Sequence, residues 1–379
     1  MNNAQIKELK YFDIGKLKDN ITSNISSIGA KYFWEQGYTG KNVVVAILDT
    51  GCNYHHLDLK DRIIGGYNFT NEFGGDVTNF IDLNGHGTHV AGVIAASLNN
   101  LGIVGVAPEV SLLIFKVLDY KGSGTTESLI NAINYAVNWK GPNNERVNIL
   151  SLSLGLSSSK EKLHNAVKQA IANNIAIVVA SGNNGDGDFS TNEYSYPAGY
   201  DEVIAVGATD PHQAIANFTN TNKEVDIYAP GVDIESTYIN EDYVTLTGTS
   251  MAAPHVSGAL ALLINKYENL QKRKPTEPEL FNYLMQHTTN VQIGDYGETI
   301  SILNLALDVI IEETVNEQLE TTLDKSLLLK CFCEARKSQA FYTQCLDEHT
   351  SESEREFLMY LIQESATAAS YIKNMCKTV

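Results

Sequence analysis

The sequence predicts an α/β fold, a doubly wound and mostly parallel sheet with helices on both faces. Continuous apolar runs rich in β-branched residues, such as residues 42–48, indicate strands that are buried on both faces. These runs alternate with segments of helical periodicity, such as residues 128–139, and this alternation is typical of parallel sheets. Polar residues such as Asp49 stand where strands end, and such sheets bind ligands at the carboxyl ends of their strands.

The individual elements follow from the same patterns along the chain. A short helix is expected over residues 28–37, where Gly37 ends it. Further helices are expected over residues 90–96, 128–139 and 160–173, and a buried helix begins near Ser250. Strands are expected over residues 42–48, 111–118, 147–154, 175–180, 203–208 and 225–229.

Length and composition limit the class of protein. A chain of 379 residues, 43% of them hydrophobic, is long enough for one large domain and a smaller appendage. No stretch approaches the ~18 consecutive apolar residues that a membrane span needs. Residues 1–10 lack the apolar segment of a secretory signal, so we expect a cytoplasmic protein.

Charge and cysteine content narrow the partners. The formal net charge of −18 argues against nucleic acid or an anionic membrane as a partner, and it suits cation binding where carboxylates cluster. Cys52 stands alone and the other cysteines lie near the end of the chain, which is a poor disulfide framework. This cysteine pattern agrees with a cytoplasmic location.

The stretch around Ser250 has the character of a nucleophile site. Ser250 lies between Gly248 and Gly258 in a run of small residues that leads into an apolar segment. This pattern predicts a tight turn that brings a hydroxyl to the first turn of a buried helix, where unpaired N–H groups and the helix dipole favour a developing oxyanion. Taken alone, a serine that caps a core helix is the commoner explanation of this pattern.

A second stretch supplies a base. His86 lies between two glycines ahead of a small-residue helix, with His89 three positions later. A lone histidine is more often structural, and a metal site is a weak alternative, because no Glu lies between the two histidines and no third ligand is evident. Together with Asp49, the set fits nucleophilic catalysis: Ser250 attacks a carbonyl, His86 is the general base, and Asp49 orients the imidazole.

Three motifs, residues 49–51, 86–92 and 248–254, resemble the signatures of the subtilisin family of serine endopeptidases. The chain order Asp, His, Ser is that of subtilisin. The resemblance spans residues 19–310, and on residues 48–52, 63–70 and 185–188 it is strongest to the bacterial intracellular subtilisins. It implies a serine endopeptidase that acts on protein or peptide substrates.

The resemblance also implies residues that bind substrate. Asn183 matches the side-chain donor of an oxyanion hole, although without the triad it would be taken for a turn residue in a Gly-rich loop. The substrate would pair as an added strand with two backbone segments. A small, uncharged pocket would favour cleavage after medium or large apolar residues. The binding residues so implied are Gly122, Ser123, Gly124, Ser153, Leu154, Gly155, Ala180, Ser181, Gly182 and Ser195.

Two cation sites are expected. The resemblance implies that the loop 97–103 interrupts the helix after His86 and wraps a Ca²⁺ ion, the all-oxygen ligation that this cation prefers. The implied ligands are Asp58, Asn99, the backbone of Ser97, Leu101 and Ile103, and Asp19. A second candidate is the loop that carries Asp186, Asp188 and Glu193, which a solvated acidic loop explains equally well.

We expect three regions: an N-terminal extension over residues 1–18, a catalytic domain over residues 19–311, and a helical extension over residues 312–379. Intracellular family members carry an extension that covers the cleft until it is removed, but residues 9–12 lack the proline expected there, so self-inhibition is a hypothesis. Apolar residues at helical spacing predict a C-terminal hairpin that docks on the catalytic domain or on a second copy, as a homodimer. Its cysteines are expected to be reduced thiols rather than zinc ligands.

Two alternatives to a broad endopeptidase stay open from the sequence. A dedicated processing protease, for instance a leader-peptide peptidase, would use the same chemistry on one substrate. An inactive subtilase that serves as a scaffold normally has a replaced catalytic residue, whereas Asp49, His86, Ser250 and Asn183 are all present. The sequence therefore favours an active enzyme.

Overall fold

The computed structural model describes residues 20–293 and 298–307. These residues belong to one compact unit whose last residue is Leu307. The expected N-terminal extension, the C-terminal hairpin with its cysteines, and Asp19 lie outside the described residues.

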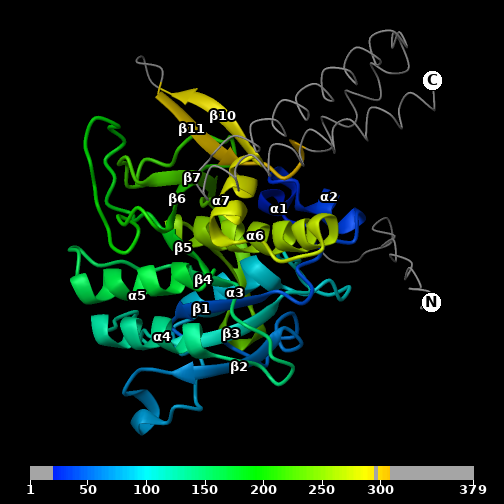
Figure 1. Ribbon diagram of the computed structural model, residues 1–379, viewed down its shortest axis with the longest axis vertical. Helices are drawn as coiled ribbons and strands as arrows, with labels where there is room; N and C mark the ends of the chain where they lie inside the picture. Colours follow the sequence, from blue (N-terminus) through cyan, green and yellow to red (C-terminus); the bar gives the residue numbers. More distant parts are fainter. Residues whose placement is uncertain (1–19, 294–297, 308–379) are drawn as a thin grey trace, which may run out of the picture. The chain divides into compact units, whose positions relative to one another are not determined.

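The centre of the fold is a nine-stranded sheet in the order β10-β11-β7-β6-β5-β4-β1-β3-β2 (Figure 1). Neighbouring strands from β2 to β7 and on to β11 are parallel, and only the pairing of β10 with β11 is antiparallel. The predicted mostly parallel α/β fold is therefore confirmed. The strands are β1 (Val44–Asp49), β2 (Ile63–Asn68), β3 (Ser111–Lys116), β4 (Ile149–Leu152), β5 (Ala176–Ala180), β6 (Ile204–Thr209), β7 (Val225–Pro230), β10 (Thr288–Ile293) and β11 (Glu298–Leu303).

Helices cover both faces of the sheet. Alternate residues of β1 point to opposite sides, with Val45 and Ile47 in one hydrophobic cluster and Ala46 and Leu48 in the other. The first cluster includes α3 (His86–Ala95) and α6 (Thr249–Gln271). The second includes α4 (Thr126–Asn138) and α5 (Glu161–Ala172), which lie side by side (Figure 1). This two-sided burial explains the continuous apolar runs in the sequence.

The sheet brings distant polar residues to one edge. Asp49 is the last residue of β1, Ser153 directly follows β4, and Asn183 follows β5 by three positions. Because these strands are parallel, their carboxyl ends meet on the same edge. The helices α3 and α6 begin at this edge, so His86 opens one helix and Ser250 lies in the first turn of the other.

Several elements differ from the sequence prediction. The helix expected over residues 28–37 is α2 (Ala30–Glu35), whereas the short helix α1 (Ser23–Ser27) before it was not predicted, and α3 begins four residues earlier than expected. Short or glycine-containing segments gave no clear periodicity and were not predicted as elements. They are the edge strand β2, the hairpin of β8 (Ile234–Thr237) and β9 (Tyr243–Leu246), the short helices η2 (Glu72–Gly75), η3 (Ile239–Glu241) and α7 (Glu277–Met285), and the pair β10–β11.

The central helix α6 offers a matched test of the core. Leu260 is 0% exposed and Leu270, on the same helix, is 58% exposed. We expect Leu260→Ala to lower the free energy of unfolding by about 2–5 kcal/mol, because it leaves a cavity in the packed core. Leu270→Ala should change it by less than about 0.5 kcal/mol. Urea unfolding followed by circular dichroism measures both, and equal effects would contradict the packing of α6.

Candidate active site

Asp49 and His86 form a buried pair at the carboxyl edge of the sheet. His86 Nδ1 lies 2.8 Å from Asp49 Oδ1, and this oxygen also accepts the N–H of Thr50 at 2.7 Å. Asp49 is 1% exposed, whereas a quarter of the His86 side chain reaches solvent. The carboxylate of this pair is therefore buried in the protein, whereas the imidazole is accessible to solvent.

The surroundings of His86 favour its protonated form. Burial lowers the pKa of His86, but the charge of Asp49, its hydrogen bond and the charge of Asp82 together outweigh burial, so the pKa lies above its ordinary value. His89, in contrast, is fully buried, and its Nε2 lies 2.9 Å from the Ile234 carbonyl oxygen. Burial lowers the pKa of His89 to about 4, so it is a neutral structural residue near pH 7. The metal alternative for the two histidines finds no support in this geometry.

Ser250 lies in the first turn of α6 and is anchored to the chain after β4. Its Oγ donates to the Ser153 carbonyl at 3.4 Å, and Ser153 Oγ donates back to the Ser250 carbonyl at 2.8 Å. Among the described residues, Ser250 makes no hydrogen bond to His86. Ser153 and His86 nevertheless line the same cavity. A catalytic hydrogen bond of this kind is often long without substrate and shortens in the complex, so the predicted Ser–His contact stays a prediction.

Asn183 is oriented by the start of α6. Its Oδ1 accepts the backbone N–H of Thr249 at 2.9 Å and the Thr249 hydroxyl at 2.8 Å. With the oxygen fixed in this way, the amide Nδ2 is the end left to donate. The backbone N–H of Ser250 belongs to the first turn of the helix, where N–H groups have no intrahelical acceptor. The two donors predicted for an oxyanion hole therefore come from neighbouring segments.

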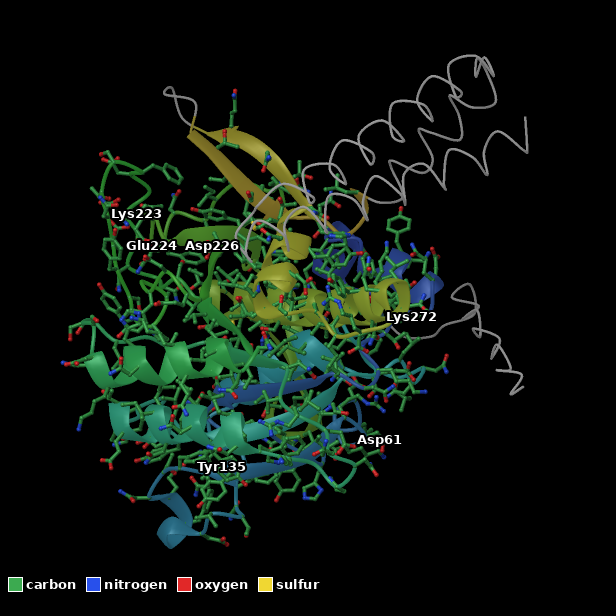
Figure 2. The ribbon with its side chains drawn as sticks, in the orientation of Figure 1. Asp61, Tyr135, Lys223, Glu224, Asp226 and Lys272 are labelled. Carbon is green, nitrogen blue, oxygen red and sulfur yellow. The ribbon has the colours of Figure 1, made fainter. Side chains whose placement is uncertain are left out.

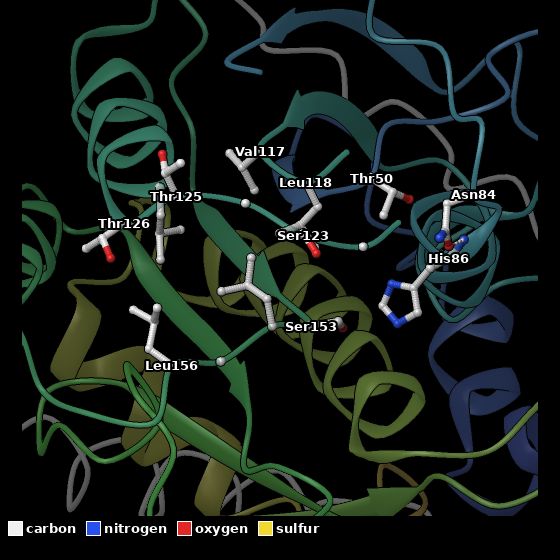
Figure 3. Close-up of a pocket in the computed structure, with 15 residues that line it drawn as sticks. Thr50, Asn84, His86, Val117, Leu118, Ser123, Thr125, Thr126, Ser153 and Leu156 are labelled. Atoms are coloured by element: carbon white, nitrogen blue, oxygen red, sulfur yellow. Dashed lines mark hydrogen bonds between the residues drawn. The ribbon is translucent and has the colours of Figure 1, made fainter. Parts of the chain in front are cut away.

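A cavity of about 420 Å³ runs beside His86, within the size range of ligand sites (Figure 3). Its walls are the two backbone segments that were predicted to bind substrate. Figure 3 shows His86, Asn84 and Thr50 at one end of the view and Thr125, Thr126 and Leu156 at the other. The predicted residues that line the cavity are Gly122, Ser123, Gly124, Ser153, Leu154 and Gly155.

The other four predicted binding residues do not line this cavity. Ala180 and Ser181 are buried at the end of β5, and the N–H of Gly182 donates to Thr249 Oγ1 at 3.2 Å. Ser195 lies against Gly155, where a Cβ would fall 2.0 Å from Ser195 Oγ. These four residues thus surround the Asn183 loop and the outer side of the cavity wall rather than its interior.

Sequence reasoning missed several residues at the cavity. Thr50, Asn84, Leu129 and Leu156 line it, and Asp82 lies buried behind His86. Asp82 gave no capping signal, since it lies three residues before Gly85, the N-cap residue of α3. Leu129 and Leu156 gave no signal either, because apolar residues on a helix and after a strand are equally expected in a core.

Comparison with known proteins identifies the family. The model of the subtilase family matches residues 40–318. The chain is 49% identical over 295 residues to the major intracellular serine protease of Bacillus subtilis (strain 168), covering 77% of this chain and 91% of that protein. It is 48% identical over 270 residues to an intracellular serine protease of Paenibacillus polymyxa (71% and 81% covered), and 45% identical over 266 residues to subtilisin DY of Bacillus licheniformis (69% and 90% covered).

The chain belongs to the subtilase family. It is therefore a serine endopeptidase, as the resemblance of its three motifs implied. In the described part of this subtilase, no helix is long and apolar enough to cross a membrane.

The last turn of α3 in this subtilase is completed by residues that lie beyond the next loop. The N–H of Val106 donates to the Val93 carbonyl at 2.9 Å, and that of Ala107 donates to the Ile94 carbonyl at 2.8 Å. Residues beyond the loop thus complete the last turn of α3. The predicted interruption of this helix is present, and the chain between Ala96 and Gly105 is free to form a loop at its end.

Asp58 lies under this loop. The side chain is 0% exposed; Oδ1 accepts the Asn99 amide at 3.0 Å, and Oδ2 accepts the Ile103 N–H at 3.2 Å and the Tyr243 hydroxyl at 2.8 Å. These donors are neutral, so none of these hydrogen bonds brings a positive charge to the buried carboxyl group, and a bound cation would supply one. The oxygen-rich set fits Ca²⁺. Asn99 turns its nitrogen to Asp58, while its oxygen accepts the Leu101 N–H at 2.9 Å.

The carboxylates of the second predicted cation site accept hydrogen bonds from different partners. Asp186 accepts the Asp188 N–H at 2.9 Å, and Glu193 accepts the Thr221 N–H at 3.1 Å. Hydrogen bonds with Thr191 and Thr221 lower the pKa of Glu193. Across the described residues, no group of three or more His, Cys, Asp or Glu side chains is placed to hold a metal ion. A second site at these residues stays a prediction.

The Asp49–His86 pair gives a prediction about proton affinity. Asp49→Asn replaces the carboxylate by a neutral amide and so removes the charge that raises the pKa of His86, while burial, which lowers it, remains. The pKa of His86 should therefore fall. NMR titration of the histidine ring protons measures it. Asp61→Asn, at an exposed surface position (Figure 2), is the matched control and should leave the His86 titration unchanged. An unchanged or raised pKa in Asp49→Asn would contradict the pairing.

Proposed function

We propose that this serine endopeptidase works through Asp49, His86 and Ser250, with Asn183 as an oxyanion donor, on peptides that bind in the cavity beside His86. The observation that carries the proposal is the Asp49–His86 contact of 2.8 Å at the end of that cavity. The position of Ser250 at the start of α6, next to Ser153, supports the choice of nucleophile.

In the proposed mechanism, His86 takes the proton of Ser250 Oγ as this oxygen attacks the scissile carbonyl. Asp49 holds the imidazole in the tautomer that accepts at Nε2 and stabilises the imidazolium. Asn183 Nδ2 and the Ser250 N–H hold the oxyanion of the tetrahedral intermediate. The imidazolium then protonates the leaving amine, and water, activated by the same base, releases the acyl group.

The cavity supports a preference for apolar side chains. Leu118, Leu129, Leu154 and Leu156 contribute to its walls, and the described lining contains no acidic or lysine side chain. Glycines in the two wall segments permit the close approach that backbone pairing with an extended peptide needs. We propose broad cleavage after medium or large apolar residues. A dedicated processing role would appear as turnover of a single peptide.

We further propose that the protein acts in the cytoplasm and depends on Ca²⁺ at the loop 97–103. The names of the two relatives described as intracellular support the location. The burial of Asp58 among neutral donors supports the cation site, which Asp58, Asn99 and backbone oxygens of Ser97, Leu101 and Ile103 would form. Bound there, Ca²⁺ would supply charge compensation and tie the loop to the fold. The proposed homodimer rests on residues outside the described part.

The chemistry is tested by active-site labelling. A fluorophosphonate probe should label the wild type and not Ser250→Ala. Asn183→Ala should keep its labelling site but lose kcat with little change in KM, since loss of such a donor costs a subtilisin about 10²- to 10³-fold in kcat. Asn184→Ala, at the exposed neighbouring position, is the control and should stay within about twofold of wild type. Labelling of Ser250→Ala, or an unaffected Asn183→Ala, would refute the assignments.

The cation is tested by thermal unfolding in a chelator. Removing Ca²⁺ should lower the Tm of the wild type, because a ligand at about 100-fold above its Kd stabilises a fold by about 2.7 kcal/mol. Asp58→Asn should lose most of this response, whereas Asp61→Asn should keep it. A wild-type Tm that the chelator leaves unchanged would refute the calcium proposal. If Asp58→Asn keeps the full response to the chelator, the calcium site lies elsewhere in the protein.

A further inference from the structure

Asp82 is a buried carboxylate beside the triad that the proposed mechanism does not use. Its side chain is 4% exposed and lies just before α3. Oδ1 accepts the Thr50 hydroxyl, the Asn84 N–H and the Gly85 N–H, each at 2.9 Å. Oδ2 accepts the Thr88 N–H at 2.9 Å and its hydroxyl at 2.7 Å. Every one of these donors is neutral, so none of these hydrogen bonds brings a positive charge to the group.

The Thr50 hydroxyl connects this carboxylate to the triad. Thr50 follows Asp49 at the end of β1 and donates to Asp82, and the same oxygen accepts the N–H of Gly87 at 2.9 Å. Gly87 follows His86 in α3. One hydroxyl therefore ties the residue after the catalytic acid to the residue after the base, and Asp82 holds that hydroxyl in place.

We propose that Asp82 is a positioning residue for the triad: it fixes the end of β1 against the first turn of α3, and its charge favours the imidazolium that forms on His86 during catalysis. This inference rests on the proposed peptidase function. It assigns a role to Thr50, Gly87 and Thr88, motif residues that the triad itself leaves unexplained.

The electrostatics around Asp82 agree with this role. The charge of Asp82 adds to that of Asp49 in raising the pKa of His86 against the effect of burial. Cys52 also faces both carboxylates, and burial followed by the charge of Asp82 raises the pKa of its thiol, which keeps it neutral. Other titratable groups nearby are Lys116, whose Nζ donates to the Thr50 carbonyl and pairs with Glu72 at 2.7 Å, and the neutral His89 on α3.

A purely structural role makes a different prediction. A carboxylate at a helix N-terminus stabilises the helix by hydrogen bonds and by the helix dipole. If Asp82 did only this, its replacement would lower stability and leave the pH dependence of the reaction unchanged. The acidic limb of the profile of kcat/KM against pH reports the pKa of the base in the free enzyme, so it separates the two roles.

The first experiment is Asp82→Asn. This variant keeps one oxygen acceptor and the side-chain volume, but it loses the charge and cannot accept from Thr88. We expect the acidic limb to move to lower pH, because His86 loses a neighbouring anion, and kcat to fall about tenfold with KM within about twofold. Asp76→Asn is the matched control: Asp76 is exposed and accepts the Thr78 N–H at 2.9 Å and its hydroxyl at 2.7 Å, the same pair of contacts. Its profile should match the wild type.

The second experiment compares Thr50→Val with Thr50→Ser and applies even where Asp82→Asn does not fold. Thr50→Val removes the bridging hydroxyl and should lower kcat about tenfold, whereas Thr50→Ser keeps it and should retain most of kcat. Equal impairment of both, or wild-type kinetics in Thr50→Val, overturns the inference, as does an unmoved acidic limb in a folded Asp82→Asn. Fluorophosphonate labelling distinguishes failure of the proposed function from failure of this inference. A wild type that is not labelled at Ser250 refutes the proposed function. A labelled wild type with unaffected variants refutes only the role of Asp82.

Discussion

The hydrogen bond between Asp49 and His86 requires the end of a central strand to meet the beginning of a helix. β1 pairs with β3 on one side and β4 on the other, so Asp49 ends a strand that its neighbours hold firmly. α3 packs on the face of the sheet to which Val45 and Ile47 point, and it begins at His86. The parallel arrangement then places Ser153 and the Asn183 loop on the same edge, because their strands run in the same direction. The chemistry of the site is thus a consequence of strand direction as much as of residue type.

Sequence patterns predicted the elements whose burial is two-sided. The runs that became β1, β3 and β5 are largely apolar, and α4 and α5 show helical spacing, so their positions differ from the prediction by only a few residues. The motif residues Asp49, His86 and Ser250 were found because each stands at an element boundary beside glycines. The exact start of α3 was missed because Gly85 and Gly87 obscure helical periodicity.

Other parts of the site depend on contacts that no local pattern encodes. The hairpin β8–β9 is short, yet Tyr238 donates to the Asn84 carbonyl at 2.9 Å and Tyr243 donates to Asp58 at 2.8 Å. The hairpin therefore contacts both the turn before His86 and Asp58, which lies under the loop after α3. Gly85, at φ 105°, lies against the Tyr238 ring, where a Cβ would fall 2.2 Å from a ring carbon. Such a contact joins residues about 150 positions apart, so only the folded chain shows why glycine is needed there.

The interrupted end of α3 has a consequence for the order in which the chain folds. An ordinary helix can propagate turn by turn from local residues. The last turn of α3 instead takes its N–H donors from Val106 and Ala107, which become available only after the intervening loop has closed. Loop closure carries an entropic penalty that must be met before these bonds form. The end of α3 opposite His86 is therefore completed only when the neighbouring loop has closed.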